Sequence, residues 1–244
     1  MEPVNGKVAI VTGASNGIGR AIAERLAQDG TLVIVNYAKS ADKAKAVVAG
    51  IESRGGLAVA IQADVSDVAE GRRLVTETVQ RFGRLDILVN NAGIFASKPL
   101  VDTTEEEYDR LFAVNAKGAY FVMQEAAKVI ETGGRIVNIS TDGTHMGFSG
   151  ATVYLGTKGA LEQFTKGLAH ELAPKGVTVN TVSPGFTDTD MLDQANVREV
   201  GAESSPFKRV GTAQDIADVV AFVVSEQARW LTGQNVHAGG GVVM

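Results

Sequence analysis

The chain of 244 residues contains no cysteine. Disulfide bonds and thiol chemistry are therefore excluded, and because this composition fits a reducing compartment we expect a cytoplasmic protein. No run of 18 apolar residues occurs, which predicts that no segment spans a membrane. Residues 1–7 carry two charges and no apolar block, unlike a signal peptide. The net charge of −5 offers no basic surface for nucleic acid.

Apolar runs of strand length alternate with stretches of helical periodicity along most of the chain. The predicted strands cover residues 8–11, 31–36, 58–62, 86–89, 135–139, 177–182 and 235–237. The predicted helices cover residues 17–28, 41–53, 68–82, about 105–131 and about 151–173. Continuous apolar strands between helices are typical of a parallel sheet that is covered on both faces. The pattern therefore predicts an α/β protein of one domain, residues 1–244, with a doubly wound parallel sheet.

The stretch 186–209 is the least regular part of the sequence. It follows Pro184, contains Pro206 and is rich in polar residues. A connection of this length is unusual in a compact domain and often carries a function. We therefore expect it to form a lid over the substrate.

A glycine-rich turn, Thr-Gly-Ala-Ser-Asn-Gly-Ile-Gly, runs from Thr12 to Gly19 between the first predicted strand and the first predicted helix. Glycines at such a place permit a tight turn and let a pyrophosphate approach the backbone and the start of the helix. Arg20 follows Gly19, so the loop is not a Walker A motif, which needs Lys and then Ser or Thr. A turn without a ligand is the alternative, but its place between strand and helix favours dinucleotide binding.

The end of the second predicted strand bears on the choice between NAD(H) and NADP(H). A carboxylate about 20 residues after the glycines would accept hydrogen bonds from the ribose diol of NAD. No carboxylate occurs between Val35 and Asp42, whereas Lys39 could attract a 2′-phosphate. The sequence thus favours NADP(H) and leaves NAD(H) possible. The alternative is that Lys39 is an ordinary solvated lysine.

Tyr154 and Lys158 are four positions apart at the start of a predicted helix, which places them on one face, one turn apart. A tyrosine with its ordinary pKa of about 10 is a poor acid or base near neutrality. A nearby ammonium and a cationic nicotinamide would both lower that pKa. Tyr154 could then exchange a proton with a carbonyl oxygen while hydride is transferred. A packed tyrosine beside a surface lysine is the alternative.

Several short motifs occur together in one order along the chain. They are the glycine-rich turn, Asn90-Asn91-Ala92-Gly93, Asn115, Tyr154 with Lys158, Pro184-Gly185, and the ending with Trp-Leu-Thr-Gly-Gln at 230–234 and three glycines at 239–241. Over essentially the whole chain this set resembles the short-chain dehydrogenase/reductase family. The resemblance implies a Rossmann-type domain with a seven-stranded parallel sheet and helices on both faces. It also implies hydride transfer between a nicotinamide and a carbonyl or alcohol, and a homodimer or homotetramer.

The resemblance also implies roles for single residues. The phosphates and ribose of the dinucleotide would lie against Gly13, Ser15, Asn16, Gly17, Ile18 and Gly19. The adenosine end would meet Asn36, Tyr37, Lys39, Ser40, Asp64, Val65, Asn91, Ala92 and Gly93. The nicotinamide end would meet Pro184, Gly185, Thr187 and Thr189. Tyr154 would be the general acid/base, Lys158 would bind the nicotinamide ribose, and Asn115 would hold a water in a proton relay to Lys158. A purely structural role, capping a loop or a helix bend, is the alternative for Asn91 and Asn115.

Two positions depart from the family pattern. The serine expected thirteen residues before the tyrosine, which holds and polarises the carbonyl, is Thr141 here. Threonine supplies an equivalent hydroxyl but adds a methyl group and restricts χ1. Ser140 could replace it only if the strand end were rotated, because neighbouring strand residues face opposite sides. Asn16 stands where members that prefer NADP often carry arginine.

The expected substrate is a small free ketone or aldehyde, or the matching secondary alcohol. Many relatives with this pattern are 3-oxoacyl-[acyl-carrier-protein] reductases, whose acidic partner calls for a basic patch beside the site. Lys175 is suitably placed, but residues 131–134 read Glu-Thr-Gly-Gly, where carrier-protein reductases tend to be basic. Carrier-protein reduction therefore stays an alternative, as does a non-catalytic NADP(H)-binding sensor.

The three histidines, His145, His170 and His237, lie far apart in sequence without the spacing of metal ligands, so no metal site is predicted. His145 falls between Thr141 and Tyr154 and lines the pocket or lies on the surface. An apolar wall is expected from residues near the site loops, with core packing as the alternative: Ile94, Phe95, Met146, Phe148, Phe186 and Met191.

Overall fold

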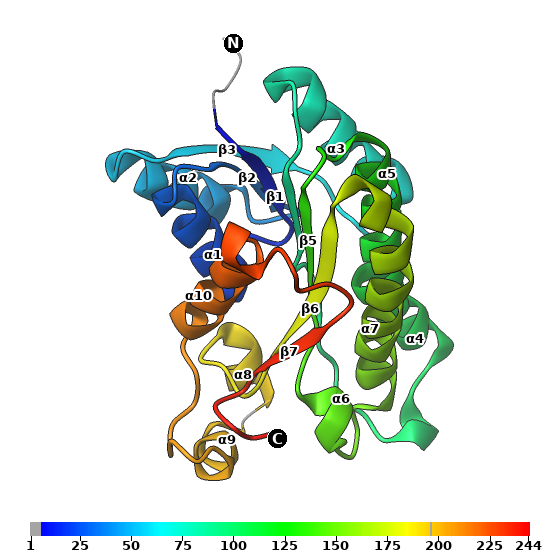
Figure 1. Cartoon of the computed structure of the whole chain (residues 1–244). Helices are drawn as coiled ribbons and strands as arrows, with labels where there is room; N and C mark the ends of the chain where they lie inside the picture. Colours follow the sequence, from blue (N-terminus) through cyan, green and yellow to red (C-terminus); the bar gives the residue numbers. More distant parts are fainter. Residues whose placement is uncertain (1–5, 196) are drawn as a thin grey trace.

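Seven parallel strands form one sheet in the computed structural model, which describes residues 6–195 and 197–244 (Figure 1). The strands are β1 (Val8–Val11), β2 (Leu32–Tyr37), β3 (Leu57–Gln62), β4 (Ile87–Asn90), β5 (Arg135–Ile139), β6 (Thr178–Pro184) and β7 (Asn235–Ala238). Their order across the sheet is β3-β2-β1-β4-β5-β6-β7, and every pairing is parallel. The fold is thus the predicted doubly wound sheet of the Rossmann type.

Helices cover both faces of this sheet (Figure 1). One face carries α1 (Gly17–Gln28), α2 (Ala41–Ser53) and α10 (Ala213–Val223). The other carries α3 (Val68–Phe82), α5 (Ala119–Val129) and α7 (Thr152–Leu172). Strand side chains alternate between the faces, so each of the strands β1 to β6 contributes apolar side chains to both cores, whereas β7 contributes only to the core on the α1 face.

The helices predicted over about residues 105–131 are present and are joined by a π-helical turn. They are α4 (Glu105–Phe112) and α5, which ends at Val129, and the π-helical turn is Ala113–Gly118. The stretch 186–209 is more regular than expected, since it contains the short helices α8 (Asp190–Ala195) and α9 (Arg198–Ser204). A single helical turn, α6 (Gly143–Met146), follows β5.

Helix α10 lies outside the helices predicted from the sequence. Thr212 and Asp215 form a capping box at its start, in which each side chain accepts from the other's backbone N–H. A Thr-x-x-Asp pattern before an apolar run is a known signal for a helix start and could have located it. Ile216 and Val220 of α10 are fully buried in the core that α1 also lines.

Several strand ends differ from the predicted ones by one or two residues. β2 covers 32–37 rather than 31–36, β4 covers 87–90 rather than 86–89, and β6 covers 178–184 rather than 177–182. β3 and β7 each gain one residue. Pairing with the neighbouring strand sets these ends: Tyr37 pairs with Gln62, and Pro184 pairs with Ala238. Among the residues that the structure describes, no helix is both long and apolar enough to cross a membrane.

Candidate active site

The predicted site residues gather at the carboxyl ends of the central strands. Strand β1 has β2 on one side and β4 on the other, so the chain reverses its direction across the sheet there. Ligands of open α/β sheets bind at such a switch point. The glycine-rich turn follows β1, and Asn91 directly follows β4. Thr141 is the second residue after β5, and Pro184 is the last residue of β6.

The glycines of the first turn are required by conformation and by space. Gly13 has φ of +62°, and a Cβ there would lie 2.9 Å from the Cα of Ala92. A Cβ on Gly19 would lie 2.3 Å from the side-chain nitrogen of Asn91. Both distances are far below normal contact, so the turn and the segment after β4 approach each other in a way that only glycine permits.

The start of α1 has the properties of an anion-binding site. Asn16 precedes the helix without a side-chain capping bond to it, and the first turn carries no acidic residue. Backbone N–H groups at a helix start lack partners within the helix and attract phosphate. The residues present therefore fit a dinucleotide pyrophosphate. The Asn16 side chain instead donates to Asp190 of α8 at 3.2 Å.

Thr12 and Asn91 hold the glycine-rich turn against the segment after β4. The Thr12 hydroxyl accepts from the backbone N–H groups of Asn91 and Ala92, both at 3.0 Å. The Asn91 side chain donates to the carbonyl oxygens of Thr12 (2.9 Å) and Gly13 (3.2 Å). Asn91 thus has the structural role considered for it. Thr12 was not among the predicted site residues, although its place at the strand end before the glycines is a signal for it.

The residues predicted for the adenosine end differ in accessibility. The Asn36 side chain is buried, where its oxygen accepts from Gly13 N–H at 3.2 Å and its nitrogen donates to the carbonyls of Ile61 and Ala63. It supports the turn rather than facing outward. Tyr37 is half-buried, and Lys39 and Ser40 are exposed.

The end of β3 holds its two predicted residues in a local turn. Asp64 accepts from the backbone N–H and the hydroxyl of Ser66 at 3.0 and 2.7 Å. Val65 is buried, and its carbonyl lies so close to Gly118 that a Cβ there would be 2.5 Å away. One carboxylate oxygen of Asp64, Oδ1, is therefore already occupied by hydrogen bonds within the turn.

Tyr154 lies in the first turn of α7 and is 7% exposed. Its ring meets that of Phe95 edge-on, with centroids 5.0 Å apart, and Thr141 is the polar side chain beside its hydroxyl. Burial raises the pKa of Tyr154 to about 12, and the hydrogen bond with Thr141 only partly opposes this. In the protein without a ligand, desolvation thus moves the pKa of this phenol upward, whereas the expected lowering involves the cationic nicotinamide as well as the ammonium.

Lys158 is buried, so the alternative of a surface lysine is wrong. Its Nζ lies 5.9 Å from the centre of the Tyr154 ring and donates to the carbonyl of Ile139 at 2.8 Å. Burial lowers the pKa of Lys158 to about 8, which leaves it mainly an ammonium at neutral pH. A Cβ on Gly93 would lie 3.3 Å from this Nζ and 3.4 Å from the Asn115 side-chain oxygen. Glycine at position 93 thus leaves room for both groups.

Asn115 is fully buried in the π-helical turn and clamps the loop after β4. Its side-chain oxygen accepts from Ile94 N–H at 2.8 Å, and its nitrogen donates to the Ile94 carbonyl at 2.9 Å and to Thr157 at 3.2 Å. Thr157 in turn donates to the Tyr154 carbonyl at 2.6 Å. Asn115 therefore connects the loop to the helix of Tyr154, the structural role considered above.

The two hydroxyl residues after β5 both approach helix α7, but they meet different residues of it. Thr141 lies beside Tyr154, and its hydroxyl accepts from Gly143 N–H at 3.2 Å. Ser140 is buried and donates to Glu162, two turns further along the helix, at 2.7 Å. Thr141 is thus the hydroxyl beside the phenol.

The segment after β6 returns to the glycine-rich turn. Thr187 donates to the carbonyl of Gly185 at 3.0 Å, and Thr189 donates to that of Thr187 at 3.3 Å. A Cβ on Gly17 would lie 3.5 Å from the methyl group of Thr189. The structure therefore brings the residues predicted for the nicotinamide end beside those predicted for the phosphates, although they are about 170 positions apart.

Two of the three histidines meet, which their separation in sequence did not suggest. The rings of His145 and His237 contact edge-on with centroids 4.6 Å apart. His237 Nδ1 lies 2.6 Å from a carboxylate oxygen of Asp142, a buried residue that was not among the predicted ones. His170 lies apart, exposed on α7. Within the described residues no group of three His, Cys, Asp or Glu side chains could hold a metal ion.

The predicted apolar wall is present in part. Phe95 packs on Tyr154, whereas Met146 and Phe148 are exposed on and after α6. Phe186 packs against α9.

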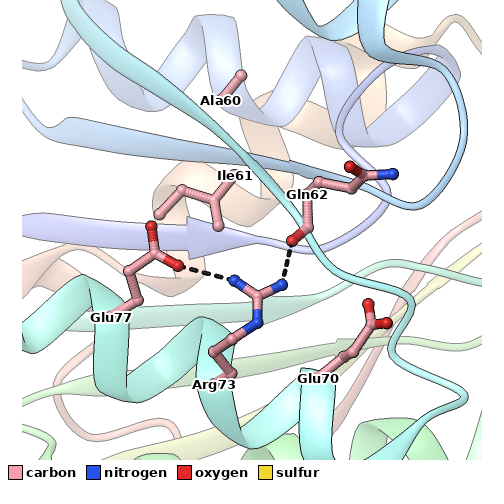
Figure 2. A pocket seen from close by; sticks show the side chains of 6 residues that line it. All are labelled: Ala60, Ile61, Gln62, Glu70, Arg73 and Glu77. Atoms are coloured by element: carbon pink, nitrogen blue, oxygen red, sulfur yellow. Dashed lines mark hydrogen bonds and ion pairs between the residues drawn. The ribbon is translucent and has the colours of Figure 1, made fainter.

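A polar cavity of about 400 Å³ lies elsewhere, between the edge strand β3 and α3 (Figure 2). Figure 2 shows Arg73 in it, donating to the Gln62 carbonyl at 2.6 Å and to Glu77 at 2.8 Å. Because this cation is already paired and the cavity lies strands away from Tyr154, it is not part of the candidate active site.

Comparison with known sequences matches nearly the whole chain. A family profile described as enoyl-(acyl carrier protein) reductase matches residues 13–243. An uncharacterized oxidoreductase of Methylorubrum extorquens is 47% identical over 99% of this chain and 100% of its own length. A 3-oxoacyl-[acyl-carrier-protein] reductase of Staphylococcus aureus is 43% identical over 98% of each chain.

Comparison with solved structures gives the same picture. A short-chain dehydrogenase from Burkholderia cenocepacia, crystallised in complex with NADP, superposes with a TM-score of 0.94. It is 44% identical, and the match covers 97% of this chain and 98% of that one.

Proposed function

The chain belongs to the short-chain dehydrogenase/reductase family of oxidoreductases, and from this premise we propose that it is an NADP(H)-dependent carbonyl reductase with Tyr154 as its proton donor. One observation carries the proposal: Thr141 is the side chain that acts on the buried Tyr154 phenol, and Nζ of Lys158, one helical turn away, lies 5.9 Å from the centre of the same ring. This is the set of groups that proton transfer to a carbonyl oxygen requires.

Each residue has a separate task in the proposed reaction. The glycine-rich turn and the start of α1 would hold the dinucleotide, which would supply hydride for the carbonyl carbon. Thr141 donates a hydrogen bond to the carbonyl oxygen, and Tyr154 donates the proton that this oxygen takes up. A phenol whose pKa is raised to about 12 holds that proton before reaction. Lys158 stabilises the phenolate left behind, which regains a proton through Lys158 and a water held at Asn115; alcohol oxidation runs through the same groups in reverse.

NADP(H) is the proposed cofactor, with NAD(H) the alternative. The uncapped start of α1 and the glycine turn suit its pyrophosphate, and exposed Lys39 suits the 2′-phosphate. The Burkholderia cenocepacia relative binds NADP. Replacement of Lys39 by Glu should weaken NADPH binding at least tenfold and leave NADH binding within a factor of two, measured by titration calorimetry. Equal losses for both cofactors would contradict the role of Lys39.

The proposed substrate is a small free ketone or aldehyde, held in one domain beneath a lid formed by residues 186–209. Two contacts support the lid: Asp190 accepts from Asn16 and lies 3.9 Å from Lys43, so α8 reaches the cofactor turn. The exposed Phe148 ring beside Gly143 supports an apolar substrate.

Carrier-protein reduction is the alternative, supported by the Staphylococcus aureus relative. Lys175, the candidate for a basic patch, donates to the Ala127 carbonyl at 3.1 Å and neighbours the acidic turn at Glu131. A comparison of turnover between free ketones and a 3-oxoacyl carrier protein separates the two substrates.

We also propose a cytoplasmic homotetramer. The cysteine-free composition suits a reducing compartment. Exposed apolar side chains support the homotetramer: Leu100 and Tyr108 line an apolar hollow of about 350 Å³ between α4 and α7, and Phe222 of α10 and Trp230 are also exposed. Large exposed apolar patches mark protein interfaces. Light scattering on the purified protein tests the number of subunits.

The proposed reaction is tested by the change Tyr154→Phe, which removes the proton and keeps the ring. We expect a loss of turnover of about 10²-fold to 10⁴-fold with NADPH and a panel of ketones, because a positioned acid contributes about that much. NADPH binding should persist. Undiminished turnover would overturn the proposed mechanism, whereas a wild type that binds NADPH without any turnover would favour the sensor alternative.

A further inference from the structure

The Asp142 side chain is a buried carboxylate that the proposed reaction does not use. It is 1% exposed and directly follows Thr141 at the corner between β5 and α6. Buried carboxylates are rare unless they are paired, because desolvation disfavours the charge. Its oxygen Oδ1 lies 2.6 Å from His237 Nδ1, while Oδ2 is buried without a hydrogen-bond partner among the described residues. Burying a carboxylate with one unpaired oxygen lowers the stability of the fold, so its presence here needs an explanation.

Asp142 connects three segments of the candidate active site. Its backbone N–H donates to the Pro184 carbonyl at 2.8 Å, which ties the corner of Thr141 to the end of β6. A Cβ on Gly185 would lie 3.4 Å from Oδ2, and one on Gly239 would lie only 1.7 Å from it. The carboxylate thus fills the space that these two glycines leave, between the segment predicted for the nicotinamide and the end of β7.

His237 comes to this carboxylate from the edge strand β7. Val236 and Ala238 pack into the core on the α1 face, so His237 between them points to the opposite face, where α6 lies. The charged groups that face Asp142 are His237 from β7, His145 from α6 and Glu162 from α7. Burial raises the pKa of Asp142, and the hydrogen bond and charge of His237 are the main opposing effects. His237 is therefore the group that most opposes the effect of burial on this carboxylate, and its hydrogen bond holds the carboxylate in place.

We propose that Asp142 and His237 form a positioning pair, which fixes the Thr141 hydroxyl and the Pro184-Gly185 segment relative to each other. The inference rests on the proposed function, because only there do these two segments face the same reacting carbonyl. When the imidazole is removed, a buried carboxylate loses its partner and either takes up a proton or turns toward water. Both responses move the corner that carries Thr141, because the carboxylate is packed between the two glycine backbones.

The first test replaces the imidazole in two ways. His237→Leu removes the hydrogen-bond donor, whereas His237→Asn retains an amide nitrogen at about the position of Nδ1. We expect His237→Leu to lower kcat at least tenfold with KM for NADPH within threefold of wild type, and His237→Asn to recover kcat to within threefold. The matched control is His170→Leu, the same change at an exposed position of α7, which should leave kcat unchanged.

A second readout is independent of turnover. The fluorescence of bound NADPH reports the surroundings of its nicotinamide, so its emission maximum should shift in His237→Leu and stay in His237→Asn and His170→Leu. Wild-type kcat together with wild-type emission in His237→Leu would overturn the positioning pair. If the wild type itself reduces no carbonyl, the proposed function fails, and the emission comparison alone decides the pair.

Should His237→Leu not fold, Gly239→Ala tests the same carboxylate from the other side. The added Cβ would collide with Oδ2, so we expect the same loss of kcat and the same emission shift. Gly167→Ala, on an exposed helix position with nothing within 4 Å of the added Cβ, is the control. Wild-type kcat and emission in Gly239→Ala would likewise overturn the proposal.

Discussion

Replacement of Lys158 by Met should make the protein without its cofactor more stable while it abolishes catalysis. Burial lowers the pKa of Lys158 from 10.5 to about 8, and each pKa unit corresponds to about 1.4 kcal/mol. Holding the ammonium in place at pH 7 therefore costs about 3 kcal/mol of folding free energy. Met fits the same channel without a charge, but the hydrogen bond from the ammonium to the Ile139 carbonyl is lost, worth about 2 kcal/mol. The net gain is about 1 kcal/mol, or about 2–4 °C in Tm.

The dependence on pH separates this reasoning from a general packing effect. Between the folded pKa of about 8 and the unfolded pKa of 10.5, the unfolded wild type binds more protons than the folded wild type. Wild-type stability therefore rises with pH across this window relative to the variant, and the gap between the two proteins closes. The difference in free energy of unfolding between wild type and variant is measured by denaturant unfolding at pH 7 and at pH 10, with both proteins at the same concentration. Equal stability at pH 7, or a gap that widens with pH, would refute the argument.

Three further predictions concern the turn, a helix cap and the hydroxyl. Gly19→Ala should abolish NADPH binding or folding, because its Cβ would meet the Asn91 side chain at 2.3 Å; calorimetric binding of wild-type strength would show that the loop adapts. Asp67→Ala removes the side chain that caps α3 through two backbone N–H groups, and should lower the free energy of unfolding by about 1 kcal/mol without changing kcat. An unchanged Tm would contradict the cap. Thr141→Ser should keep turnover within about tenfold of wild type, whereas Thr141→Val should lower turnover about 10²-fold to 10³-fold, because one hydrogen-bond donor to the carbonyl oxygen contributes that much. Similar turnover in the two variants would exclude a catalytic role for the Thr141 hydroxyl.

The fold was largely predictable because its signals are local. Each buried strand is a short apolar run between helical stretches, and the glycine turn from Thr12 to Gly19 marks the switch point at which the sheet binds ligands. Helix α10 was missed although Thr212 and Asp215 signal its start. The observed strand ends differ from the predicted ones by a residue or two because they depend on pairing with a neighbouring strand, such as Tyr37 with Gln62. The sequence of one strand does not indicate this pairing.

The residues of the candidate site could be predicted from the sequence, but the burial and the pKa of their side chains could not. Tyr154 and Lys158 are recognised by their spacing, yet the pKa of each depends on burial, which strands far away in the sequence create. Asn36 illustrates the same limit, since its side chain is buried only because β2 lies between the turn after β1 and the end of β3, to which it bonds. The contact of Asp142 with His237 joins residues 95 positions apart, and no local sequence pattern predicts it.

The packing of α1 against α10 has a consequence for the order in which the protein is made. Arg25 of α1 bonds to Asp218, 193 positions later. At translation rates of about 5–20 residues per second, α1 waits roughly 10–40 s for this partner to leave the ribosome. During that interval the apolar side of α1 that α10 will cover has no native neighbour. The apolar side of this helix therefore stays uncovered for most of the chain's synthesis.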